Sequence, residues 1–364
     1  MVITSTPFRI SFFGGGTDYP SWYRKHGGSV LSTTIDKYCY ITCRPLPPFF
    51  EHRIRVAYSQ IELCRDYTEI QHASVREALR FLNITDGLEI HHDGDLPARS
   101  GIGSSSSFTV GLLHALYACQ GKMVSKRRLA SESVHVEQNM IKEVVGSQDQ
   151  VAAAFGGLNR IDFHRNGEFD VQPLILSQSR IDELQSSMML FFTGINRTAS
   201  EVAQSYSDEA GIQARESTLK KMHAMVDSAV DLLTGNDSIN AFGELLHEGW
   251  LLKRQLSREV SNRELDEMYE EAQNAGAIGG KLIGAGGGGF LLLFVPPSRQ
   301  QEVRKRLCKK ICVPIKFDTR GSQVIFYRAN SPEYREAIAH RAKHNIMPFK
   351  ERKTSAASEL SSIR

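Results

Sequence analysis

The chain has 364 residues, of which 23% are charged and 41% are hydrophobic, and its formal net charge is +3. This length is sufficient for two domains with a substantial core, and the small net charge gives no reason to expect a nucleic-acid partner. The longest apolar runs, such as Phe290 to Val295, are too short to cross a bilayer, so we expect no membrane partner. The six cysteines form no Cys-x-x-Cys pair and a strand pattern begins at once, so we expect reduced thiols, no signal peptide and a cytoplasmic protein.

The first half of the chain shows alternating strand and helix patterns. Segments rich in β-branched and aromatic residues predict strands at Val2 to Phe13, Ser29 to Cys43, Arg53 to Tyr58 and from Leu88 onward. Apolar residues at helical spacing predict helices at Glu69 to Leu82, Ser106 to Cys119, Ser125 to Gln138 and Ser147 to Phe155. Asn166-Gly167 closes a predicted hairpin of Leu158 to Phe163 and Phe169 to Leu176. We therefore expect a mixed α/β domain over residues 1–180.

The second half begins with a new apolar strand. Strands are predicted at Met188 to Thr193, Phe290 to Val295, Val313 to Phe317 and Gln323 to Tyr327. Helices are predicted at Ala199 to Leu233, Ala241 to Leu256, Asn262 to Ala275 and Arg299 to Lys310. This order is close to a split βαβ, ferredoxin-like layer and predicts an α+β domain over residues 181–330. Residues 331–364 are polar and basic, so we expect a partly disordered tail.

A loop from Asp95 to Phe108 joins the strand that starts at Leu88 to the next helix. The first N–H groups of a helix have no intrahelical partner and the helix dipole is positive there, so this loop leads to an anion site. Gly101 and Gly103 let a phosphate approach the backbone, and the hydroxyls of Ser104 to Ser107 can bind phosphate oxygens or magnesium. The alternative is a flexible linker that ends in a serine N-cap.

Two other phosphate-binding motifs do not fit the sequence. Gly101-x-Gly103-x-x-Ser106 lacks the third glycine of the dinucleotide fingerprint. After Gly280-Lys281, Leu282 stands where a Walker A loop has Ser or Thr. Neither hydride transfer nor a P-loop nucleotide site is therefore favoured.

Three glycine-rich segments lie far apart in the sequence: Pro7 to Tyr19, Pro97 to Ser106 and Lys281 to Gly289. In order and spacing they resemble the three signature motifs of the GHMP kinases, a family that includes galactokinase, homoserine kinase and mevalonate kinase. The resemblance covers Val2 to Tyr327 and implies the two-domain GHMP kinase fold, ATP as a substrate and Mg²⁺ as a cofactor. The triple glycine before Thr17-Asp18 looks like the branch of D-glycero-D-manno-heptose 7-phosphate kinases.

The resemblance implies roles for polar residues in the first half of the chain. Asp149, in Gly146-Ser-Gln-Asp149-Gln150, would accept or polarise the hydroxyl proton while Arg9 screens the developing charge. Ser105 and Glu137 would hold magnesium, with Ser104 in place of Ser105 if the loop is offset by one residue. The alternatives are a helix cap for Asp149 and a solvent-facing charge for Glu137. The implied nucleotide-binding residues are Arg99, Ser100, Gly101, Gly103, Ser104, Ser105 and Ser106.

The first and third motifs imply the substrate site. Asp18, with Gly16 and Thr17, would bind sugar hydroxyls, since a carboxylate accepts bonds from vicinal hydroxyls. Galactokinases carry Glu and His where this chain has glycines, which argues against galactose. Lys37, Arg24 and Arg99 are candidates to bind a phosphate on the sugar, the alternative being solvated surface charges. Gly286 and Gly287, within Gly284 to Gly289, would close over the phosphates or brace the floor of the active site, the alternative being packing alone.

The resemblance implies an ATP- and Mg²⁺-dependent kinase that phosphorylates the anomeric hydroxyl of D-glycero-D-manno-heptose 7-phosphate to the 1,7-bisphosphate, in the biosynthesis of nucleotide-activated heptose. An L-fucokinase-like enzyme and a catalytically silent nucleotide and sugar sensor are the alternatives. We expect a small sugar phosphate and ATP as partners, and a homodimer stays open.

Overall fold

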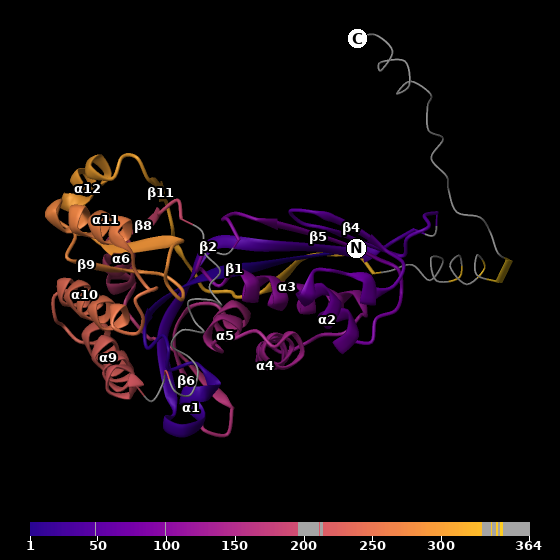
Figure 1. Ribbon diagram of the computed structural model, residues 1–364, viewed down its shortest axis with the longest axis horizontal. Coiled ribbons are helices and arrows are strands. Elements are labelled where there is room, and N and C mark those ends of the chain that lie inside the picture. Colours follow the sequence, from indigo (N-terminus) through magenta and orange to yellow (C-terminus); the bar gives the residue numbers. More distant parts are fainter. Residues whose placement is uncertain are drawn as a thin grey trace, which may run out of the picture.

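The computed structural model describes residues 1–47, 49–98, 100–195, 211, 214–329, 336, 340, 343 and 344. Its helices and strands form two bodies, each with one sheet and helices packed on it (Figure 1). The first body holds the N-terminal half of the chain together with the last two strands, and the second body holds the segment between them. No helix among the described residues has the length and apolar character needed to span a bilayer.

The sheet of the first body is built on a long antiparallel hairpin of β1 (Val2–Phe13) and β2 (Gly28–Pro45). Every residue of β1 except Ile3 is buried, which is typical of a strand that is covered on both faces. The strands lie in the order β13-β1-β2-β5-β3-β4, while β12 and β6 also pair with β2 and β7 pairs with β6. Their bounds are β3 (Ile54–Ala57), β4 (Ile61–Cys64), β5 (Leu88–Gly94), β6 (Leu158–Phe163), β7 (Phe169–Pro173), β12 (Phe317–Asp318) and β13 (Gln323–Tyr327).

Helices cover one face of this sheet (Figure 1). The central helix, α3 (Ser104–Cys119), packs on β1 and β2 and is buried along most of its length because α4 and α5 lie on its other side. The other helices are α1 (Pro20–His26), α2 (Ala73–Phe81), α4 (Lys126–His135) and α5 (Gln148–Phe155), with a 3₁₀ turn at Tyr67–Glu69 and a π-helical turn at Val136–Ile141 that continues α4. The predicted helices of this half are therefore confirmed, with shifted ends.

The sheet of the second body has the strand order β11-β8-β10-β9, and each neighbouring pair is antiparallel. Its strands are β8 (Met188–Phe192), β9 (Gly279–Leu282), β10 (Phe290–Phe294) and β11 (Ile311–Val313). Its helices are α6 (Gln178–Ser186), α9 (Glu216–Thr234), α10 (Asn240–Arg254), α11 (Arg263–Asn274) and α12 (Gln300–Arg306), with a 3₁₀ turn at Pro297–Arg299. This is the ferredoxin-like order that the sequence predicts, with β9 as an additional strand that the glycine-rich pattern concealed.

The last strands differ from the prediction. The predicted strand Val313 to Phe317 is two strands, because Pro314 has no N–H to donate and ends β11. β12 pairs with β2 and β13 pairs with β1, so both belong to the first sheet rather than to the second layer. The first part of the predicted helix Ala199 to Leu233 and almost all of the predicted tail lie outside the described residues.

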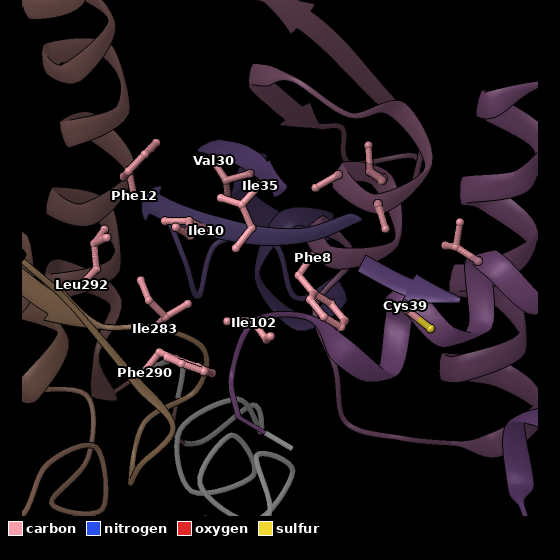
Figure 2. Close-up of a cluster of buried hydrophobic side chains, with 14 of the residues drawn as sticks. Phe8, Ile10, Phe12, Val30, Ile35, Cys39, Ile102, Ile283, Phe290 and Leu292 are labelled. Atoms are coloured by element: carbon pink, nitrogen blue, oxygen red, sulfur yellow. The ribbon is translucent and has the colours of Figure 1, made fainter. Parts of the chain in front are cut away.

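One hydrophobic core runs through both bodies (Figure 2). Ile10 and Phe12 of β1 belong to the same cluster as Ile283 and Phe290 of the second body. The ring of Phe12 meets that of Phe242 on α10 edge to face, with centroids 5.5 Å apart, a contact worth about 1 kcal/mol beyond its buried area. Because the two bodies share this core, the loop between β9 and β10 lies beside the loop before α3.

Candidate active site

Arg9 and Asp149 form an ion pair at the centre of the candidate site. Arg9 lies on β1 and is 4% exposed, and Asp149 lies in the first turn of α5. Nε and Nη2 of Arg9 donate to the two carboxylate oxygens of Asp149 at 2.6 and 2.7 Å, and Nη1 donates to the carbonyl of Gly101 at 2.7 Å. The N-cap of α5 is Ser147, so the interpretation of Asp149 as a cap is wrong. The structure thus brings together the two residues predicted to carry catalysis.

The N-terminus of α3 lies beside this ion pair. The helix begins at Ser104, two residues before the predicted start, because Gly103 takes a left-handed conformation at the N-cap position. A Cβ on Gly103 would lie 3.2 Å from Arg9 Cγ and 3.4 Å from Asp149 Oδ2, so a residue without a side chain permits this approach. The first turn of α3, the part of a helix whose N–H groups have no acceptor within the helix, therefore lies next to the predicted catalytic residues, as a site for phosphate requires.

The serines of this loop lie in different surroundings. Ser105 is exposed, whereas Ser106 is buried and donates its hydroxyl proton to Glu137 Oε2 at 2.9 Å. Ser100 is buried and donates to the carbonyl of Pro97 at 2.5 Å, so its hydroxyl closes the loop. The structure therefore places Ser106, rather than Ser105, beside the predicted magnesium ligand.

Two further residues of the predicted nucleotide site complete this loop. Ser104 is half-buried at the first position of α3, and Arg99 lies outside the described residues. Ser104 therefore takes part in the N-terminal turn that the anion site uses.

Glu137 is a fully buried carboxylate in the π-helical turn that continues α4. Oε2 accepts hydrogen bonds from Ser106 and from the side-chain amide of Gln150, while Oε1 has no hydrogen-bond partner among the described residues. Burial raises the pKa of Glu137 to about 7, against the opposing effect of the neighbouring Thr109, Ser106 and Gln150 side chains. The interpretation of Glu137 as a solvent-facing charge is wrong.

The surroundings of Glu137 fit a magnesium ion. Its unpaired Oε1 is a hard oxygen ligand, and the serine hydroxyl beside it is another. The described part of the chain contains no cluster of three or more His, Cys, Asp and Glu side chains able to hold a metal. Mg²⁺ commonly binds through one or two protein carboxylates together with substrate phosphates, so this sparse ligand set suits it.

Asp18 is buried beneath the glycine turn of the first motif. The N–H of Gly16 donates to Asp18 Oδ1 at 3.0 Å, and the N–H of Gln148 donates to Oδ2 at 3.4 Å. Burial, followed by the nearby Asp149 carboxylate, raises the pKa of Asp18. A Cβ on Gly146 would overlap the carboxylate of Asp18, which explains the glycine at that position.

Thr17 has a structural place in the same turn. It is fully buried, and its hydroxyl lies 2.7 and 2.9 Å from the carbonyl oxygens of Gly14 and Ser29. Because its side chain faces the hairpin, the structure supports the sugar-binding prediction for Asp18 and Gly16 more than for Thr17.

The third motif packs its backbone against the second. A Cβ on Gly284, whose φ is +81°, would lie 2.5 Å from Gly101 Cα, and a Cβ on Gly101 would overlap the carbonyl oxygen of Ile283. Gly287 N–H donates to the carbonyl of Val260 at 2.9 Å, and Gly286 also lies against Val260. Gly284 thus packs against the loop before α3, whereas Gly286 and Gly287 pack against Val260. A closure of Gly286 and Gly287 over the phosphates stays a prediction.

Two buried lysines belong to the site although sequence reasoning gave them no role. Lys281 on β9 donates to the carbonyl of Phe12 at 2.7 Å, and Lys253 on α10 donates to the carbonyls of Leu282 and Gly284. Burial, followed by the charge of Arg9, lowers the pKa of Lys281 to about 7. Burial also lowers the pKa of Lys253, followed by the charge of Lys281. The place of Lys281 inside the third motif was an available signal, but Lys253 offered none.

Two of the three predicted phosphate-binding cations, Lys37 and Arg24, lie in the described part of the chain. Lys37 donates to the carboxylate of Asp36 at 2.8 Å, and Arg24 is exposed on α1. Neither has a hydrogen bond or ion pair with Arg9, Asp18 or Asp149 among the contacts of the described residues.

Two family models match the chain. The model for the N-terminal domain of GHMP kinases matches residues 70–157, which include the loop before α3, Glu137 and Asp149. The model for the C-terminal domain of GHMP kinases matches residues 229–311, which include the third motif.

Individual relatives agree with these models. The D-glycero-alpha-D-manno-heptose 7-phosphate kinase of Campylobacter jejuni is 30% identical over 321 residues, covering 84% of this chain and 93% of that protein. The bifunctional fucokinase/GDP-fucose pyrophosphorylase of Arabidopsis thaliana is 25% identical over 329 residues, which are 83% of this chain and 30% of that protein. A crystal structure of a D-glycero-D-manno-heptose 1-phosphate kinase from Bacteriodes thetaiotaomicron superposes with a TM-score of 0.73 at 26% identity, covering 91% of this chain and 100% of that one.

These matches indicate a phosphotransferase with an alcohol group as acceptor and ATP as donor, that is, a sugar kinase. The chain belongs to the GHMP kinase family.

Proposed function

We propose that this enzyme transfers the γ-phosphoryl group of ATP to the anomeric hydroxyl of D-glycero-D-manno-heptose 7-phosphate and forms the 1,7-bisphosphate, in the biosynthesis of nucleotide-activated heptose. The observation that carries the proposal is the Arg9 and Asp149 ion pair, held against the N-terminal turn of α3 and next to Asp18. The likeness to two heptose phosphate kinases supports the choice of sugar.

Asp149 is the residue that we assign to the sugar hydroxyl. A carboxylate oxygen has two acceptor positions, so an oxygen of Asp149 that accepts from Arg9 can still accept from a hydroxyl. The hydroxyl oxygen attacks the γ-phosphorus, its proton passes to Asp149, and the bond to the β,γ-bridging oxygen breaks to leave ADP. Arg9 orients the carboxylate and offsets negative charge at the transferring group.

Glu137 is the residue that we assign to Mg²⁺, with the hydroxyl of Ser106 or Ser105 beside it. When bound, Mg²⁺ screens the charge of the ATP phosphates. The N–H groups in the first turn of α3 bind the same phosphates from the protein side.

Asp18 is the residue that we assign to the sugar hydroxyls. For the phosphate at the far end of the sugar we retain Arg24 and Lys37 as candidates. Arg24 follows the Asp18 turn directly on α1 and has its side chain exposed, which favours it over the paired Lys37.

Two alternatives have support of their own. The likeness to the fucokinase favours a kinase of the anomeric hydroxyl of free L-fucose. A catalytically silent sensor is opposed by the intact ion pair of Arg9 and Asp149 and by the buried Glu137. We further propose action in the cytoplasm, and a homodimer stays a prediction.

The test is ADP release by the purified protein with ATP, Mg²⁺ and a panel of sugars, each offered with and without its terminal phosphate. Turnover that requires heptose 7-phosphate supports the proposal, and turnover of free L-fucose replaces it with the alternative. Asp149→Asn is the control for contaminating kinases, because it removes the acceptor charge of this enzyme and leaves the activity of any contaminant unchanged.

A further inference from the structure

Two buried side chains beside Gly15 in the first glycine turn carry oxygen atoms that have no hydrogen-bond partner in the described part of the chain. They are the hydroxyl of Ser11, on β1, and the amide oxygen Oε1 of Gln148, the first residue of α5. Ser11 is 6% exposed and Gln148 is 7% exposed. Because buried polar groups are nearly always paired, such atoms at a binding site point to groups of the ligand.

Both side chains face the same stretch of backbone. A Cβ placed on Gly15 would lie 3.8 Å from Ser11 Oγ and 3.8 Å from Gln148 Nε2. Gly15 itself is only partly buried, so the space between Gly15 and these two side chains lies at the edge of the glycine turn. Any side chain at position 15 would enter that space.

Gln148 also connects this space to the predicted catalytic residues. Its backbone N–H and its side-chain amide hydrogen-bond to Asp18, which leaves Oε1 as a spare acceptor. The next residue in the chain is Asp149. Spare acceptors on Gln148 and Asp18, with one hydroxyl on Ser11, favour a ligand that is rich in hydroxyl donors.

We propose that Ser11 and Gln148 bind hydroxyl groups of the sugar and thereby determine which sugar the enzyme accepts. The inference rests on the proposed function in one respect, that the sugar binds next to Asp18 and Asp149. It does not depend on whether that sugar carries a terminal phosphate.

Ser11→Ala is the sharper variant because it removes only an unpaired hydroxyl. We expect kcat/KM for the sugar to fall about 10-fold, while KM for ATP and the unfolding midpoint in the absence of sugar do not fall. Ser74→Ala is the matched control, since Ser74 on α2 is also 6% exposed and lies outside this set of residues. Gln148→Met should lower kcat/KM for the sugar about 100-fold, because it also removes the hydrogen bond to Asp18.

Deoxy sugars identify the hydroxyl directly. The 2-, 3- and 4-deoxy analogues of the best sugar on the panel are compared with the parent sugar in wild type and in Ser11→Ala. One analogue should lose about 10-fold in kcat/KM with wild type and no more than 2-fold with the variant, since the partner of that hydroxyl is gone.

The outcomes separate this inference from the proposed function. If a free sugar replaces heptose 7-phosphate as the best substrate, the proposed substrate fails while the comparison of analogues proceeds with the free sugar. Unchanged kcat/KM in Ser11→Ala, or a loss that comes with a lowered unfolding midpoint, overturns the inference. Absence of both turnover and calorimetric sugar binding in wild type overturns both.

Discussion

The ion pair of Arg9 and Asp149 should stabilise the folded protein by more than an exposed ion pair with the same N to O distance. Arg9 is 4% exposed and Asp149 is 24% exposed, and the closest N to O distance is 2.6 Å. Asp149→Asn removes the negative charge and replaces one acceptor oxygen with a donor, while the guanidinium remains buried and charged. Removing one partner of a buried pair typically costs 3 to 5 kcal/mol. Since Asp149 is partly exposed, we expect the free energy of unfolding to fall by about 3 kcal/mol.

A double-mutant cycle isolates the pair from other effects of the substitution. Arg9→Met should also cost about 3 kcal/mol, whereas the double variant Arg9→Met/Asp149→Asn leaves no unpaired charge and should cost little more than either single variant. The coupling is then about 3 kcal/mol. Arg263 and Glu267 provide the matched control, because their N to O distance is also 2.6 Å but their side chains are 92% and 58% exposed. Their coupling should be no more than about 0.5 kcal/mol.

Urea unfolding of the single and double variants of each pair, beside wild type, measures both couplings, and turnover measures catalysis on the same proteins. Asp149→Asn should lower kcat about 100-fold or more while ATP binding survives, and the double variant, which is about as stable as either single variant, should not regain activity. A coupling at Arg9 and Asp149 as small as that of the surface pair would refute the account of burial. Unchanged turnover in Asp149→Asn would remove this carboxylate from the mechanism.

Glu137→Gln should raise the Mg²⁺ concentration needed for half-maximal turnover about 10-fold or more. The control Glu248→Gln, at an exposed residue, should leave that concentration unchanged. Equal magnesium titrations for the two variants would contradict the assignment of Glu137 as a ligand of Mg²⁺. Gly284→Ala should raise KM for ATP about 10-fold because its Cβ would lie 2.5 Å from the nucleotide loop. Gly121→Ala, with a φ of +71° and nothing within 4 Å, should cost only about 1 kcal/mol of stability and leave KM for ATP unchanged. Burial lowers the pKa of Lys281 to about 7, below its unfolded value, so the folded state binds fewer protons between pH 7 and pH 10 and gains stability as pH rises through that window. Between pH 7 and pH 9, the free energy of unfolding of wild type should therefore rise by about 2 to 3 kcal/mol relative to that of Lys281→Met, measured by urea unfolding. If the free energies of unfolding of the two proteins change in parallel with pH, the lowered pKa of Lys281 is disproved.

Local sequence patterns predicted most helices and strands because apolar periodicity follows burial within each element. They did not predict which strands pair. β13 follows the second body in sequence but pairs with β1, and that choice depends on contacts between residues more than 300 positions apart, such as Ile3 and Phe326. The proline that ends β11 was visible in the sequence, but its effect on the following strands was not.

The candidate site was predicted through motif spacing, and its errors have a geometric origin. The order of the three motifs was enough to predict that Arg9 and Asp149 belong to one site, and they are in contact in the structure. The order of the motifs did not identify Ser106 as the serine beside Glu137, because the prediction was Ser105 with Ser104 as the alternative. Successive residues on a helix point about 100° apart, and α3 begins earlier than the sequence pattern indicated. Motif spacing therefore located the loop that lies beside Arg9 and Asp149, but it left the serine side chain uncertain by one residue.

The buried charges of the site explain why its lysines escaped prediction. A buried lysine is rare, and each one considered alone is best interpreted as a surface charge. In the structure five of the side chains interact electrostatically as a group that does not include Glu137. The group has one more basic than acidic side chain: Arg9, Lys253 and Lys281 against Asp18 and Asp149. Such an excess is costly until an anion binds, and the phosphates of ATP supply one. Binding of the nucleotide should therefore favour the charged form of Lys281, so that ATP without sugar removes much of the pH dependence that separates wild type from Lys281→Met. A pH dependence of unfolding that is unchanged by saturating ATP would place these lysines in the packing of the third motif and not in the binding of phosphate.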